Sequence, residues 1–187
     1  WASTRLLAIS GATLLPTMVA AWVLSVADRF FLVRIVSATE LGYYATAIKF
    51  ASLLFVAMSP LYSSWMPLAL ADQHNETARV RYPMMSRYLI SIALFGSLGL
   101  ALFSTEFLLV LGLQNYISAT PYIGVLTYPH VFAAISVPLS INQMMDKKLS
   151  ILSSSVVLGA VVNMLLNVLL ISTFGIWGAV VATVLGY

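Results

Sequence analysis

The sequence predicts an all-α membrane protein, a polytopic bundle of about six transmembrane helices. Hydrophobic residues make up 61 % of the chain, charged residues only 8 %, and the mean hydropathy is +0.98. Soluble proteins carry roughly a quarter charged residues. Several uncharged stretches reach the roughly 20 residues that a helix needs to cross a bilayer. Strand-period alternation is absent, so helices account for the apolar stretches.

The expected helices cover residues 6–36, 40–70, 84–112, 119–145, 149–173 and 176–187. The first would be about 46 Å long, which exceeds a hydrocarbon core of about 30 Å, so it must tilt, bend or protrude. Pro16 is the natural bend, because proline removes a helical hydrogen bond. The second helix begins at a predicted capping box, in which Ser37 and Glu40 bond to each other's backbone.

Prolines and basic residues in the rest of the chain predict a kink in one helix and the orientation of the helices in the membrane. The fourth contains Pro129 and Pro138, which predict a kink. Basic residues cluster at 72–87 and at 146–148, which lie on the same side if helices three and four cross once each. By the positive-inside rule that side is cytoplasmic, and the end of the first helix faces outward. The sequon at 75–77 is then a chance match.

Composition and motifs exclude several functions. The net charge of +3 comes from basic residues beside the spans, which form no nucleic-acid-binding patch. Cysteine is absent, and no metalloprotease, phosphate-loop or serine-hydrolase motif occurs. The chain is therefore expected to be neither an enzyme nor dependent on a cofactor. His74 stands in a polar loop, and His130 is interpreted as an interhelical hydrogen-bonding residue or a proton relay.

The charges inside the first two helices are the strongest functional signal. An ionisable group near the bilayer centre costs on the order of 3 kcal/mol and usually faces a bundle interior or a wet cavity. Trp22, Ser25 and Arg29 share a helix face, with Trp22 about 10 Å from Arg29 along the axis. This face could offer an aromatic ring to a sugar and a guanidinium to a phosphate. Alternatively, Arg29 only joins two helices by pairing with Glu40 or Glu106.

Lys49 heads a stripe of small and polar residues on the second helix, and a ligand or cavity role is favoured for it. The stripe consists of Ala45, Lys49, Ser52, Val56, Ser59 and Ser63. Arg34 is an outer contact or a solvated end residue. Asp28 lies about 100° round the helix from Arg29 and is either a coupling-ion site or a counter-charge for Lys49.

Asn163 and Asn167, one helical turn apart, are expected to join helices by hydrogen bonds rather than to contact substrate. Glycines are expected to allow close helix packing, and they stand at positions 96, 99, 175, 178 and 186.

Three segments resemble the polysaccharide (O-antigen type) flippases of the MOP exporter superfamily. Residues 28–32 and 40–49 are similar to its "D-R-x-x-L … E-x-G-x-Y-x-x-A-x-K" pattern. Residues 163–167 and 175–183 resemble its "N-x-x-L-N … G-I-x-G-A-A-x-A-T" signature. The family's isoleucine-proline after the paired asparagines is Ile171-Ser172 here. The resemblance covers nearly the whole chain, which would be a fragment: a single six-helix C-terminal lobe with its last helix truncated.

The resemblance implies a multi-pass protein of the bacterial inner membrane that acts by alternating access. Its expected partners are membrane lipids, a missing N-terminal lobe and an undecaprenyl-pyrophosphate-linked oligosaccharide, with H⁺ or Na⁺ as a possible coupling ion. Arg29, Lys49, Arg34 and Trp22 are the expected cargo-binding residues, and Asp28 is the candidate coupling residue. The alternatives are a MATE-type multidrug cation antiporter and a non-transporting scaffold or polymerase of the same pathway.

Overall fold

A computed structural model describes residues 2–71, 78–145 and 149–187, and every regular element in these ranges is a helix. About 93 % of the described residues are helical. This confirms the all-α prediction. Some features of the sequence lie outside the described residues: the sequon at 75–77, His74, the basic cluster at 146–148 and part of the segment 72–87.

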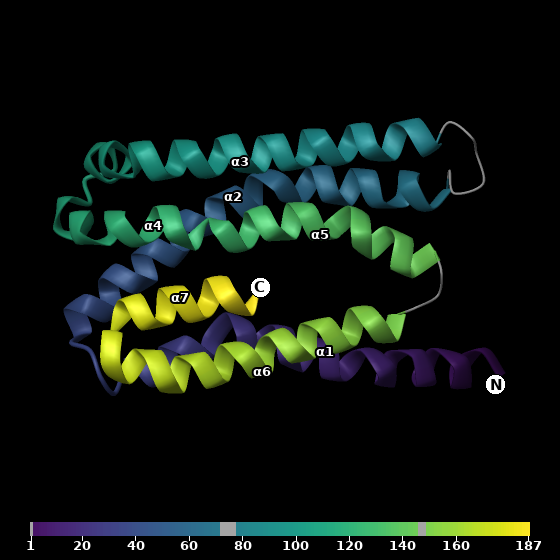
Figure 1. The fold of residues 1–187 in the computed structure, drawn as a ribbon, viewed down its shortest axis with the longest axis horizontal. Coiled ribbons are helices and arrows are strands. Elements are labelled where there is room, and N and C mark those ends of the chain that lie inside the picture. The colour runs from purple at the N-terminus through teal and green to yellow at the C-terminus, as the bar shows by residue number, and fades with distance from the viewer. Residues whose placement is uncertain (1, 72–77, 146–148) are drawn as a thin grey trace. The chain divides into compact units, whose positions relative to one another are not determined.

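The helices form two compact units, Trp1–Val36 with Lys148–Tyr187 (unit 1) and Ser37–Lys147 (unit 2). Unit 1 contains α1 (Ala2–Leu32), α6 (Leu149–Phe174) and α7 (Ile176–Gly186). Unit 2 contains α2 (Ala38–Ala71), α3 (Ala78–Val110), the short 3-10 helix η1 (Gln114–Ala119), α4 (Thr120–Leu126) and α5 (Tyr128–Met145). Figure 1 shows α6 and α7 as a hairpin and α2 and α3 side by side.

Five segments of the described chain are long and apolar enough to cross a membrane. They are Leu15–Leu32, Ala38–Ala69, Arg81–Val110, Gln114–Ser140 and Ser153–Phe174. In the apolar 18-residue stretch of each segment, only 22 to 33 % of the residues are buried inside the protein. Most of each span therefore presents apolar side chains outward, as a lipid environment requires.

The helix ends differ in places from those expected from hydropathy. The α1 helix ends at Leu32 and residues 33–36 form hydrogen-bonded turns, whereas α3 begins at Ala78, before the expected start at residue 84. Hydropathy marks the hydrocarbon boundary, but a helix can continue beyond it into polar surroundings. Pro16 lies inside α1, which remains one helix through it.

The start of α2 confirms the predicted capping box. The Ser37 backbone N–H donates to a carboxylate oxygen of Glu40 at 2.9 Å, and the Glu40 N–H donates to the Ser37 hydroxyl at 3.2 Å. The Ser37 hydroxyl also donates to Glu40 at 2.8 Å. These bonds satisfy donors that have no partner within the helix and so fix where α2 begins.

The expected fourth helix is interrupted at Thr127, which separates α4 from α5. Pro129 has no N–H to donate to Val125, so the helical ladder is broken here. The Thr127 hydroxyl donates to the Gly124 carbonyl at 2.6 Å and lies 2.5 Å from the Ser97 hydroxyl of α3. This buried pair holds the interruption against α3.

Each unit has its own apolar core. In unit 2, α2, α3 and α5 meet in a cluster of buried residues: Leu54, Met58, Trp65, Ala69, Leu89, Ala93, Val131 and Ala134. In unit 1, Ala20 and Leu24 of α1 pack against Ala160 of α6.

Candidate functional site

The first candidate face lies on α1. Trp22, Ser25 and Arg29 are all exposed, and Trp22 retains 59 % of its accessible surface. The Ser25 hydroxyl donates to the Trp22 carbonyl at 2.8 Å, so it is turned back onto the helix. Among the described residues of unit 1, the Arg29 guanidinium has neither a hydrogen bond nor an ion pair. The aromatic ring and the cation thus lie on the outward face of α1.

Arg34 follows the end of α1. Its backbone N–H donates to the Phe31 carbonyl at 3.2 Å, and its side chain is exposed. The turn therefore carries a second cation about one and a half helical turns beyond Arg29.

Asp28, unlike Arg29, is buried, with 3 % of its surface exposed. One of its carboxylate oxygens accepts the backbone N–H of Arg29 at 2.7 Å. The carboxylate also lies close enough to Tyr187 for a Coulomb interaction. The adjacent residues thus face different surroundings, as their separation of about 100° round the helix predicts.

The second candidate face lies on α2 in unit 2. Lys49 is exposed, and no acid among the described residues of this unit pairs with it. The serines of its stripe are half-buried or exposed. Ser52 donates to the Lys49 carbonyl at 2.7 Å, and Ser63 donates to the Ser59 carbonyl at 2.9 Å. Each of these hydroxyl groups donates its proton to a backbone carbonyl, and its oxygen can still accept a hydrogen bond.

Glu40 and Glu106, the acids considered as partners of Arg29, both belong to unit 2, whereas Arg29 belongs to unit 1. Glu40 serves the capping box and lies near Tyr122, and Glu106 is exposed. Of the sequence-predicted site residues, Trp22, Asp28, Arg29 and Arg34 share one segment of unit 1, and Lys49 is in unit 2.

The paired asparagines join α6 to α7, as predicted. Asn163 is fully buried and donates its amide to the Ala182 carbonyl at 3.0 Å. Asn167, also fully buried, donates to the Asn163 side-chain oxygen at 3.0 Å. The Asn167 side-chain oxygen has no hydrogen-bond partner among the described residues.

Some of the glycines allow close packing between helices, as expected. A Cβ at Gly186 would lie 2.6 Å from the Asn163 Cβ, and one at Gly96 would lie 2.6 Å from Leu54. The expectation is wrong for Gly99, where a Cβ would meet nothing within 4 Å. Gly175 is required for its backbone, since its φ of +54° favours glycine at the turn from α6 to α7.

Two features escaped sequence reasoning. The His130 ring packs against Phe55, with ring centroids 6.0 Å apart, and the expected interhelical hydrogen bond of His130 is not found among the described residues. The Ser97 and Thr127 pair was not anticipated either, because serine and threonine are common in apolar helices and nothing local marks a partner 30 residues away. Pro129 was the available signal in the sequence. A proline interrupts the backbone hydrogen bonds of a helix, and a nearby hydroxyl can then bond to a backbone carbonyl.

The fold and these faces define an all-α, multi-pass membrane protein with cations on outward faces of two spans. Comparisons with protein families, with characterised proteins and with solved structures found no match.

Proposed function

We propose that the chain belongs to a transporter that flips an undecaprenyl-pyrophosphate-linked oligosaccharide across the bacterial inner membrane, for surface polysaccharide or O-antigen synthesis. The proposal rests on the surroundings of two basic residues, Arg29 and Lys49. Both lie within apolar spans, both are exposed, and neither pairs with an acid among the described residues of its unit. A cation inside an apolar span is costly, most of all near the bilayer centre, where the cost is about 3 kcal/mol, and it needs a compensating partner. An anionic cargo supplies one.

The chemistry of a pyrophosphate fits these side chains. Esterified by the lipid at one end and the sugar at the other, it carries about two negative charges, and its oxygens accept paired hydrogen bonds from a guanidinium. Attraction between unit charges 4 Å apart rises from about 1 kcal/mol in water to about 4 kcal/mol near a protein surface. Arg29 in unit 1 and Lys49 in unit 2 would each offer a positive charge to the pyrophosphate, and Arg34 would serve as an outer contact.

The sugar part of the cargo would meet the polar surroundings of these cations. Trp22 lies seven residues before Arg29, or about 10 Å along the helix, and its exposed ring could stack on a sugar. The serine hydroxyls of α2 can accept hydrogen bonds from sugar hydroxyls.

In this proposal the chain forms one MOP-type lobe, and a second, N-terminal lobe completes the transporter. The cargo would be exposed to each leaflet in turn by alternating access. A MATE-type antiporter would instead carry cationic cargo, which exposed Arg29 and Lys49 would repel. A non-transporting scaffold or polymerase would leave both cations without a role in export.

Replacing Arg29 or Lys49 by alanine in the full-length protein tests the proposal in cells. Each variant is expected to lower surface polysaccharide at least tenfold at unchanged protein level, because one charge-assisted contact is worth about 1.5 to 3 kcal/mol. The matched control is Arg87→Ala, which removes an exposed arginine of α3 and should leave export normal. Normal export by both the Arg29 and the Lys49 variant would remove the assignment.

Asp28 is our candidate for the coupling residue. A buried carboxylate with 3 % of its surface exposed and Tyr187 within Coulomb range could take up H⁺ or Na⁺. In vesicles containing the full-length protein, an imposed proton or sodium gradient should raise the flipping rate several-fold. Asp28→Asn, which keeps the side-chain shape, should abolish that response. An equal response in both proteins would exclude Asp28 from coupling.

A further inference from the structure

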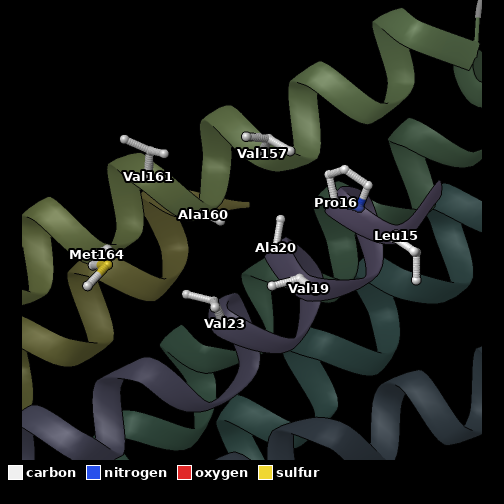
Figure 2. A pocket seen from close by; sticks show the side chains of 9 residues that line it. All are labelled: Leu15, Pro16, Val19, Ala20, Val23, Val157, Ala160, Val161 and Met164. Atoms are coloured by element: carbon white, nitrogen blue, oxygen red, sulfur yellow. The ribbon is translucent and has the colours of Figure 1, made fainter. Parts of the chain in front are cut away.

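Between α1 and α6, unit 1 has an open apolar groove of about 660 Å³ (Figure 2). Residues 15–23 of α1 and 157–164 of α6 supply its walls, and every lining side chain is apolar. Val19 and Val161 remain 59 % and 51 % exposed. The groove is thus accessible from the outside of unit 1 and offers no hydrogen-bonding side chain to an occupant.

The groove leads towards the cations of α1. Val19, Val23, Val26 and Phe30 follow one another at steps of four and three, so they lie in one stripe along the helix. Phe30 is 62 % exposed and adjoins Arg29. Along the axis, Arg29 is about 9 Å from Val23 and about 21 Å from Leu15. On α1 the apolar stripe therefore reaches the level of Arg29, whose side chain projects about 100° round the helix from Phe30.

We propose that this groove holds the polyprenyl chain of the cargo while Arg29 and Arg34 hold its pyrophosphate. The inference rests on the proposed function and adds a place for the lipid part. A molecule with an anionic head and a long hydrocarbon chain is complementary to a cationic end joined to an apolar path.

The length of the path favours a polyprenyl chain over the acyl chain of a phospholipid. One leaflet of hydrocarbon is about 15 Å deep, half of the core thickness. An acyl chain whose phosphate lay at Arg29 would therefore end near Val19. The groove continues to Leu15, beyond this depth, and a chain longer than one leaflet is needed to fill it.

Binding of the chain in the groove would be stabilised by van der Waals packing and not by transfer of apolar surface out of water. Lipid chains are as apolar as the groove, so van der Waals packing decides between occupants. A bulky side chain inside the groove should therefore displace the polyprenyl chain and leave the phosphate contacts intact.

The test measures dissociation constants of the full-length protein in detergent for undecaprenyl pyrophosphate and for geranyl pyrophosphate, whose short chain ends near Val23. Val19→Trp and Val161→Trp each place an indole in the groove. We expect about tenfold weaker binding of the long chain, a change of one decade in the constant, and unchanged binding of the short one. Met18→Trp is the control, because Met18 is 69 % exposed and lies outside the groove.

The outcomes separate this inference from the proposed function. If Arg29→Ala weakens both ligands but neither groove variant changes the affinity for undecaprenyl pyrophosphate, the groove is not the chain's site and the function stands. If the natural protein binds neither ligand, both proposals fail. Equal weakening by Met18→Trp and Val19→Trp would also overturn the groove assignment.

Discussion

Replacing Gly178 by alanine is expected to break the packing of α7 on α6. A Cβ at this position would lie 2.3 Å from the Leu170 carbonyl oxygen, 2.4 Å from its carbon and 2.7 Å from the Ile171 nitrogen. All three are backbone atoms of α6, so no side chain can rotate away to make room. Overpacking commonly costs 1 to 3 kcal/mol, and a clash with backbone belongs at or above the upper end, about 3 kcal/mol.

The separation of the two helices would also disturb the asparagine network. The bond from Asn163 to the Ala182 carbonyl crosses the same interface, and both groups are buried. A buried polar group that loses its partner costs about 1 to 3 kcal/mol. The two penalties together should remove most of the folded protein.

Thermal unfolding of the full-length protein in detergent measures this effect. We expect Gly178→Ala to lower Tm by many degrees or to abolish recovery of folded protein. Gly99→Ala is the matched control, since its Cβ meets nothing within 4 Å and alanine favours a helix by about 1 kcal/mol over glycine. Equal melting temperatures for the two variants would contradict the packing described for Gly178.

The helical class and the spans could be predicted from sequence because both depend on composition and local signals. The capping box at Ser37 and Glu40 was equally predictable, since its two members are only three residues apart. The burial of Asp28 beside an exposed Arg29 agrees with their angular separation on one helix. In each case the cause lies within a few residues of its effect.

The properties that depend on distant residues could not be predicted. Gly99 and Gly178 look alike in sequence, but only Gly178 has the backbone of another helix against its Cα. The same reason hid the contact of His130 with Phe55. The helical wheel predicted that Trp22 and Arg29 share a face. Whether that face turns towards the core or away from it depends on α6.

In the proposed function, the exposed cations of α1 and α2 bind an acidic cargo. A flippase of this kind differs from a drug antiporter in the sign of its cargo's charge. One assay should therefore measure transport of an anionic cargo and of a cationic cargo. Vesicles containing the purified full-length protein can be loaded with an undecaprenyl-pyrophosphate-linked oligosaccharide and with ethidium, a permanent cation. Movement of the lipid between leaflets and efflux of the dye are then followed in the same sample.

We predict that the natural protein moves the anionic lipid and not the dye. We also predict that the double variant Arg29→Ala with Lys49→Ala moves the lipid at least 100-fold more slowly, since two contacts of about 1.5 to 3 kcal/mol are lost. Efflux of ethidium without movement of the lipid would contradict the proposed function. So would lipid movement that is unchanged in the double variant.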